Sequence, residues 1–221
     1  MQAPDMKLYR NMRAATACVV RRLTKGALVA WGLGLSGMAM AEAPAAVLPA
    51  YICAGCHGTG GNSNGPAIPT LAGASRDYII KAMEDYQSDE RVSTIMGRIA
   101  KGYSKEEIAR IADFFSGQAF VPARGQKSNP ELAGEGARLH DRYCEKCHAK
   151  GGSSPENDAG ILAGQWTPYL KYTLADMLAG RSRMPQKMKK KLGTLYRKVG
   201  DAAVDQLLNY YAGSKPRGSG R

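Results

Sequence analysis

Two short motifs contain residue types that can bind a redox cofactor covalently. Residues 53–57 read Cys-Ala-Gly-Cys-His and residues 144–148 read Cys-Glu-Lys-Cys-His, so both have the pattern C-x-x-C-H. Two cysteines three residues apart lie on one face of a helical turn, so both sulfurs can form thioethers with one porphyrin. The histidine that follows can then direct its imidazole at the iron. The motifs predict two c-type hemes attached to Cys53, Cys56, Cys144 and Cys147, with His57 and His148 as iron ligands.

Other uses of paired cysteines fit this spacing poorly. A zinc ribbon places its two C-x-x-C pairs about 15–20 residues apart, whereas these pairs are 91 residues apart. A thioredoxin-like dithiol needs a βαβ setting, and the chain has no run of strand-like alternation. Disulfides within the motifs would leave both histidines unexplained.

Methionine is the natural second axial ligand, because no other histidine is suitably placed. His140 precedes Cys144 by four residues and is expected to be a solvated residue on a helix face. Met96 lies in a predicted loop that must cross the face of the first heme opposite His57. For the second heme, the spacing of the two motifs favours Met188, whereas the following proline favours Met184, which we choose as the predicted ligand. A histidine–methionine pair raises the reduction potential and closes the iron to substrate.

The N-terminus has the pattern of a secretory signal peptide over residues 1–41. Six basic residues precede an apolar run from Gly26, which ends in Ala39-Met40-Ala41. This run is short for a membrane span. Cleavage after Ala41 removes six basic residues, Asp5 and Cys18, so the net charge falls from +12 to +7. We therefore expect a periplasmic protein without a membrane span, and export argues against nucleic acid as its partner.

The chain repeats itself at an interval of 91 residues. Leu71-Ala72-Gly73 recurs as Leu162-Ala163-Gly164, and Tyr78 recurs as Tyr169. Phe114-Phe115 recurs as Tyr210-Tyr211 at an interval of 96 residues, so the second copy has gained five residues. Two copies indicate a duplicated domain rather than a solenoid.

Apolar spacing and capping residues predict that both copies are helical. The predicted helices cover residues 76–87, 132–147, 167–178 and 201–212, and another starts at Ser104 with a capping box to Glu107. The fold class is therefore all-α, with two tandem domains that each enclose one heme; the resemblance described next implies that these are class I cytochrome c domains. We expect domains at 42–120 and 132–214, a linker at 121–131 and a flexible tail at 215–221.

The chain resembles the diheme cytochrome subunit of flavocytochrome c sulfide dehydrogenase, which is related to tandem class I cytochromes c. The matching stretches are CAGCHGTGGNSNGPAIPTLAG, STIMGRIAKGYSKEEIARIADFF, LHDRYCEKCHAKGG and ILAGQWTPYLKYTLADM. The resemblance implies that Met96 and one of Met184 and Met188 are iron ligands. It also implies an electron-transfer subunit rather than an enzyme: electrons pass from the FAD of a separate flavoprotein, through the two hemes, to a soluble cytochrome. The alternative is a free diheme carrier that serves a terminal oxidase or reductase.

Two further expectations concern the surroundings of the hemes. In class I cytochromes c a proline carbonyl orients the heme histidine, and Pro69 fits this role, but position 160 is glycine. The second histidine is therefore expected to use another carbonyl. Around Met96, we expect Arg98, Lys101 and Tyr103 to be exposed and to contact the flavoprotein, unless Arg98 and Lys101 pair with heme propionates.

Overall fold

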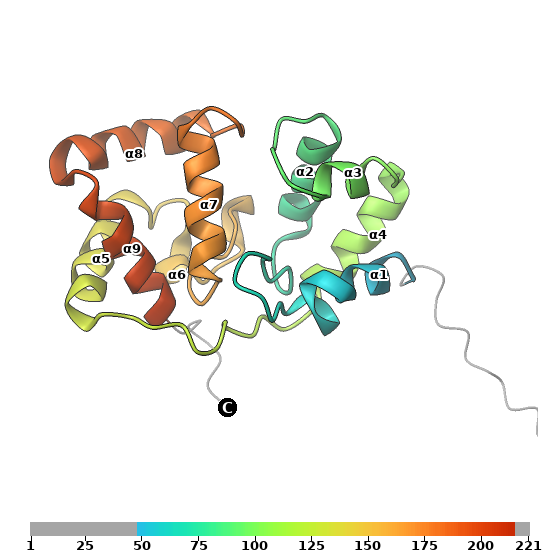
Figure 1. Ribbon diagram of the computed structural model, residues 1–221, viewed down its shortest axis with the longest axis horizontal. Coiled ribbons are helices and arrows are strands. Elements are labelled where there is room, and N and C mark those ends of the chain that lie inside the picture. Colours follow the sequence, from blue (N-terminus) through green and yellow to red (C-terminus); the bar gives the residue numbers. More distant parts are fainter. Residues whose placement is uncertain (1–47, 215–221) are drawn as a thin grey trace, which may run out of the picture. The chain divides into compact units, whose positions relative to one another are not determined.

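The computed structural model describes residues 48–214 (Figure 1). The predicted signal peptide and the predicted tail lie outside the described residues. The first copy of the repeat contains α1 (Leu48–His57), η1 (Thr59–Gly61), α2 (Arg76–Gln87), α3 (Met96–Ala100) and α4 (Lys105–Ser116). The second contains α5 (Pro130–Tyr143), α6 (Ala149–Gly152), η2 (Glu156–Asp158), α7 (Thr167–Leu178), α8 (Gln186–Val199) and α9 (Ala202–Gly213). The described residues contain no strand, which confirms the all-α class.

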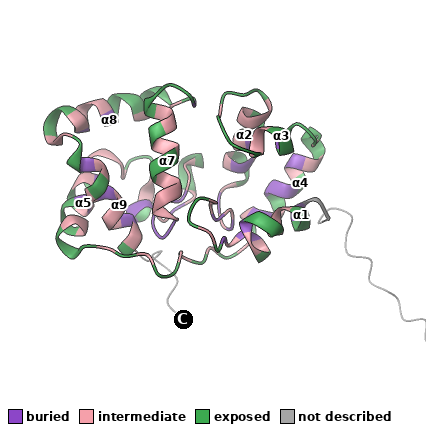
Figure 2. Cartoon of the chain, in the orientation of Figure 1, coloured by how far each residue is buried: buried purple, intermediate pink, exposed green. Residues whose placement is uncertain are grey.

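Each copy has its own apolar core. In the first copy, α2 and α4 meet around Ile79, Ile111 and Phe115, and a second cluster forms around Met83 and Ile108. In the second copy, α5 and α9 lie side by side, and Leu195 and Leu207 are at the centre of the cluster that α8 and α9 share (Figure 1). Buried residues occur on α2, α4, α5 and α9 (Figure 2).

The 91-residue repeat is visible in matching backbone hydrogen bonds. The carbonyl of Gly61 accepts from Leu71 and Ala72, and the carbonyl of Gly152 accepts from Leu162 and Ala163. The N–H of Gly73 donates to Phe115 at 2.9 Å and that of Gly164 donates to Tyr211 at 2.9 Å. These last two acceptors are 96 residues apart, as the sequence predicted.

Glycine is required where the loop turns back on the last helix of each copy. Gly61 has φ +81°, and a Cβ there would lie 2.6 Å from the Phe115 ring. Gly152 has φ +85°, and a Cβ there would lie 3.2 Å from the Tyr211 ring. Both positions therefore need a residue without a side chain.

Some helix boundaries differ from those that the sequence predicted. Helix α5 begins at Pro130, because Asn129 caps it, and it ends at Tyr143, before the second motif. Trp166, rather than Thr167, occupies the N-cap position of α7. Met96 does not lie in a loop but is the first residue of α3. The predictions for α2 and for the Ser104–Glu107 capping box of α4 are confirmed.

Polar side chains connect the two copies. The Gln165 amide accepts from the Thr70 N–H at 3.0 Å and donates to the Thr70 carbonyl at 2.9 Å. The indole N–H of Trp166 donates to the Ser63 carbonyl at 3.1 Å. The Arg183 guanidinium pairs with Glu90 at 2.9 Å. Since Gln165 and Thr70 are both buried, this contact is shielded from water.

Candidate heme sites

The first motif occupies the end of α1. His57 is 6% exposed, Cys53 is half-buried and Cys56 is exposed. The Nδ1–H of His57 donates to the Pro69 carbonyl at 2.8 Å, as expected. A carbonyl only accepts, so Nδ1 holds the proton and Nε2 keeps its lone pair for a metal. Burial lowers the pKa of His57, which favours the neutral imidazole that an iron ligand requires.

The second motif lies in turns after α5. The N–H groups of Cys147 and His148 both donate to the Cys144 carbonyl, at 3.0 and 2.9 Å. The Nδ1–H of His148 donates to the Gly160 carbonyl at 3.2 Å. Burial lowers the pKa of His148 as well. Another carbonyl therefore orients the second histidine, and Gly160 occupies the position equivalent to Pro69.

Packing against the first copy explains why residue 160 is glycine. A Cβ at Gly160 would lie 3.0 Å from the Tyr78 hydroxyl oxygen and 3.1 Å from the ring carbon that carries it. A proline, which also carries a Cβ, would meet the same ring. Tyr78 belongs to α2, so a residue of the first copy limits which side chain can stand beside the second histidine.

His140 is buried within a hydrogen-bond network, so the expectation that it is solvated was wrong. Its side chain is 0% exposed. Its two ring nitrogens lie 2.9 Å from the Tyr211 hydroxyl and 2.7 Å from a Glu145 carboxylate oxygen. Glu145 also accepts from the N–H groups of Lys150 and Gly151, at 2.8 and 3.0 Å. The network therefore holds the turns of the second motif against α5 and α9.

Met96 lies at the edge of the first core. It is half-buried and packs against the cluster of Met83, Ala100 and Ile108. The Gly97 N–H donates to the Ser93 hydroxyl at 2.8 Å, which caps the start of α3. The Gln87 amide donates to the carbonyls of Ala100 and Tyr103, both at 2.9 Å, at the other end. These bonds hold the short helix that carries Met96.

Met184 and Met188 both face the second core. Each is half-buried and packs against the cluster that contains Leu192 and Leu195. Met184 precedes Pro185, the N-cap residue of α8, and Met188 lies on the first turn of that helix. Met184 also lines a cavity of about 360 Å³ together with Leu192 and Tyr196. Both methionines therefore stay candidates for the second iron.

The chemistry of these donors fits a covalent heme in each copy. Each copy provides two thiols, one neutral imidazole with a lone pair available, and a thioether beside an apolar cluster. No disulfide joins the four cysteines of the described residues. Covalent heme supplies one-electron chemistry at its iron when it is attached.

The fold and the two motifs define a c-type cytochrome. A family model described as cytochrome c matches residues 42–118. The chain belongs to the cytochrome c family and to its diheme members, since it is 31% identical over 160 residues to cytochrome c4 of Pseudomonas aeruginosa. That alignment covers 67% of this chain and 78% of the relative.

Two further similarities concern a sulfur-oxidising enzyme and the fold. The cytochrome subunit of sulfide dehydrogenase from Chlorobaculum tepidum is 54% identical over 63 residues, which cover 28% of this chain and 56% of that protein. A crystal structure of reduced recombinant cytochrome c4 from Pseudomonas stutzeri superposes with a TM-score of 0.66 at 24% identity, and covers 79% of this chain and 99% of that one. At 24% identity, this structural similarity shows the fold alone.

These findings establish the class of protein and its cofactor. The protein is an electron carrier with two covalently bound heme c groups, one on the Cys53/Cys56 pair and one on the Cys144/Cys147 pair. No helix within residues 48–214 is long and apolar enough to cross a membrane.

Proposed function

We propose that this cytochrome accepts electrons from the FAD of a sulfide dehydrogenase flavoprotein and passes them to a soluble cytochrome in the periplasm. The observation that carries the proposal is the 54% identity to a sulfide dehydrogenase cytochrome subunit. We assign His57 and Met96 to the iron of the first heme. His148 and Met184 are assigned to that of the second, with Met188 as the alternative to Met184.

An exposed surface next to Met96 supports docking of a partner at the first copy. Arg98 is exposed on α3, two residues after Met96. An exposed cation beside an assigned iron ligand suits a partner with an acidic surface. An electron donor that docks here lies close to the first heme.

Two residues expected on this surface have other roles. Tyr103 is half-buried and packs against both clusters of the first copy, so its expected exposure was wrong. Lys101 is exposed but forms an ion pair with Asp89 at 2.7 Å. Arg98 is therefore the residue best placed to contact the flavoprotein.

The test compares Arg98→Glu with Arg110→Glu, which reverses an exposed charge on α4. Both holo-proteins are mixed with an FAD-containing sulfide-oxidising flavoprotein from the same organism. We expect Arg98→Glu to slow reduction of the cytochrome by sulfide about tenfold or more and to abolish co-purification, while Arg110→Glu has little effect. Normal rates and normal co-purification for Arg98→Glu would show that the proposed surface is wrong.

The second candidate function is a free diheme carrier for a terminal oxidase or reductase. It is favoured by the cytochrome c4 match, which covers 67% of this chain, whereas the sulfide dehydrogenase match covers 28%. The two functions differ in assembly. A cytochrome that elutes alone from a native extract and is not reduced by sulfide and the flavoprotein is a free carrier.

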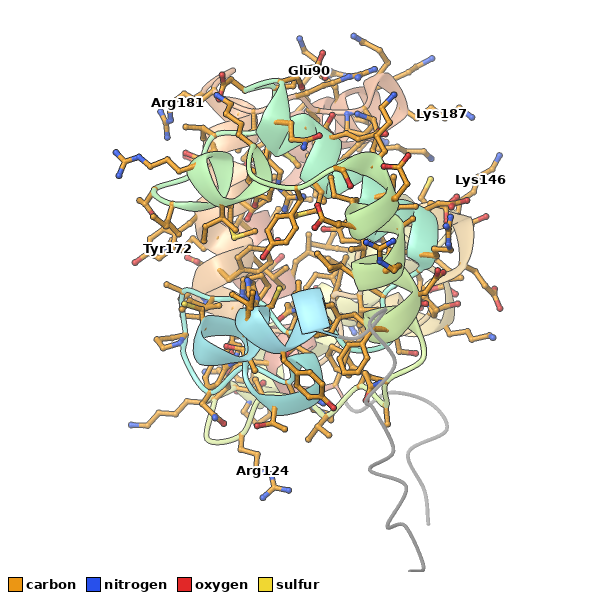
Figure 3. The ribbon with its side chains drawn as sticks, turned by 90° about the vertical axis from the view of Figure 1, so that its right-hand side faces the viewer. Glu90, Arg124, Lys146, Tyr172, Arg181 and Lys187 are labelled. Atoms are coloured by element: carbon orange, nitrogen blue, oxygen red, sulfur yellow. The ribbon has the colours of Figure 1, made fainter. Side chains whose placement is uncertain are left out.

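The lysines of α8 belong to the second copy. Lys187, Lys189, Lys190 and Lys191 are all exposed, as is Lys146 in the second motif. Lys146 and Lys187 extend outward from the protein (Figure 3). We infer that the soluble acceptor presents an acidic surface to these lysines. Electron transfer to the acceptor should then slow as ionic strength rises.

A further inference from the structure

Arg91 is a cation without an acidic partner among the described residues. It follows α2 and is partly buried. One guanidinium nitrogen donates to the Tyr169 hydroxyl at 2.8 Å, and the guanidinium carbon lies 5.0 Å from the centroid of the Tyr86 ring. Tyr78 is a further hydrogen-bond partner. The guanidinium is thus enclosed by three tyrosines from both copies.

The acidic groups nearby are paired with other cations. Asp89 binds Lys101 and Glu90 binds Arg183, at 2.7 and 2.9 Å. Asp176, which interacts with Tyr86, binds Arg181 at 2.7 Å. Within residues 48–214, Arg91 forms no ion pair with a carboxylate. A guanidinium removed from water without a counter-charge is costly.

The tyrosines around Arg91 do not supply this counter-charge. Burial raises the pKa of Tyr86 and of Tyr169 above the ordinary value for tyrosine. Their hydroxyl groups therefore stay neutral over the physiological range and act only as dipoles toward the cation.

Arg91 lies between residues of the two proposed heme sites. Tyr86, on one side, packs in the same cluster as Met96. Tyr78, on another side, approaches Gly160, whose carbonyl accepts from His148. Tyr169 completes the enclosure from α7 of the second copy.

We propose that Arg91 binds the carboxylate of a heme propionate between the two copies, and that its charge raises the reduction potential of that heme. Each heme c carries two propionates, so the cofactor of this protein supplies carboxylates that the described residues around Arg91 do not. The planar guanidinium suits bidentate binding of a carboxylate. Both hemes carry propionates, and Arg91→Gln in a Met96→His background identifies the heme that binds Arg91.

The test uses Arg91→Gln and Arg91→Lys in the holo-protein with both hemes attached. The reduction potential of each heme is measured by spectroelectrochemical titration, and the propionate bending modes are followed by resonance Raman spectroscopy. Arg91→Gln should lower one of the two potentials and shift one propionate mode. Arg91→Lys keeps the charge but loses the planar fork, so the mode should shift while the potential stays close to that of the wild type.

The matched control is Arg183→Gln, which removes another arginine that connects the two copies but pairs with Glu90. It should change neither potential nor the propionate modes. The affected heme is identified by repeating Arg91→Gln in a Met96→His background, which displaces the potential of the first heme alone.

A purely structural role for Arg91 predicts different results. The thermal midpoint would fall in both Arg91 variants, while both potentials and all propionate modes would match those of the wild type, and this would overturn the proposal. If Arg91→Gln does not fold, Arg91→Lys decides by its Raman spectrum, because an unchanged propionate mode there also contradicts the assignment.

Discussion

At the residue scale, one hydrogen bond to each motif histidine fixes which ring nitrogen carries the proton. The acceptors Pro69 and Gly160 differ in side chain but offer the same backbone carbonyl to Nδ1. Such a bond fixes the tautomer and the ring orientation of a metal-ligating histidine. Because the acceptor is a backbone group, the second copy makes the same hydrogen bond although it has glycine where the first copy has proline.

The methionine assignments can be tested by absorption spectroscopy. An iron–thioether bond gives a weak charge-transfer band at the red end of the visible spectrum of the oxidised protein. We expect Met96→Leu and Met184→Leu each to remove about half of this band, because each removes one ligand. Met83→Leu is the control, since Met83 is a buried core residue of α2. If the band is unchanged in Met184→Leu but reduced in Met188→Leu, then Met188 rather than Met184 binds the second iron.

Local spacing predicted the heme motifs but not the role of His140. The motifs are contiguous, so the sequence contains their whole signal. The partner of His140, Tyr211, lies 71 residues further along the chain, and only the packing of α5 on α9 brings the two together. A histidine four residues before a cysteine carries no local sign of that contact.

At the element scale, caps and close helix contacts decide where helices begin and how they pack. Helices α2 and α4 were predictable, because a serine cap precedes a regular apolar stripe in each. Helix α3 was not, since five residues are too few to show a period. The end of α5 depends on Glu145, whose hydrogen bonds with Lys150 and Gly151 favour turns over further helix.

Two glycines of α5 provide a matched test of its contact with α9. A Cβ at Gly136 would collide with the Gln206 carbonyl and lie 2.8 Å from the Tyr210 Cβ, whereas a Cβ at Gly134 meets nothing within 4 Å. We expect Gly136→Ala to lower the free energy of unfolding by about 2–3 kcal/mol, because the helices must separate. Gly134→Ala should raise it by about 0.5–1 kcal/mol through helix propensity. Urea unfolding followed at the Soret band measures both, and equal effects would refute the close approach.

The capping box of α4 gives a pH-dependent contribution to stability. Ser104 accepts from the Glu107 N–H at 3.2 Å, and the Glu107 carboxylate accepts from the Ser104 N–H at 2.8 Å. This bond lowers the pKa of Glu107, so its stabilisation is complete above the unfolded-state pKa and is lost as the pH falls through the folded-state pKa. Ser104→Ala should cost about 1 kcal/mol.

The pH dependence is isolated by Glu107→Gln, which should flatten the acid side of the stability profile. Glu106→Gln is the control, because Glu106 lies in the same first turn without a role in the box. The measurement is thermal unfolding at a series of pH values. Profiles of the same shape for Glu107→Gln and the wild type would show that the box does not contribute.

At the scale of the whole molecule, the two copies are joined by buried polar contacts as well as by their chain connection. Residues 121–129 connect the two copies and form hydrogen bonds with the second copy. The Gln126 amide donates to the Gln165 carbonyl at 3.0 Å, and the Ser128 hydroxyl donates to the Asn209 carbonyl at 2.7 Å. The composition of this segment indicated a linker, but these long-range bonds depend on backbone carbonyls about 40 and 80 residues further along the chain.

Replacement of Gln165 tests how strongly the copies are coupled. Gln165→Leu leaves the N–H and the carbonyl of the buried Thr70 without their partners. We expect the free energy of unfolding to fall by about 2–3 kcal/mol and the two copies to unfold at separate urea concentrations. Gln186→Leu, at an exposed position of α8, should preserve a single transition. Coincident transitions and unchanged stability in Gln165→Leu would show that the copies are independent at this contact.

The contact of Gly160 with Tyr78 gives the duplicated chain a fixed order. A chimera made from two first copies would place a proline Cβ 3.0 Å from the Tyr78 hydroxyl oxygen, so the Tyr78 ring would have to shift. One made from two second copies would present Tyr169 where Tyr78 stands and would lack Arg91, since the equivalent position is Ser182. The two copies therefore differ at the residues with which they face each other. Neither copy can replace the other unless the residues that face it are exchanged as well.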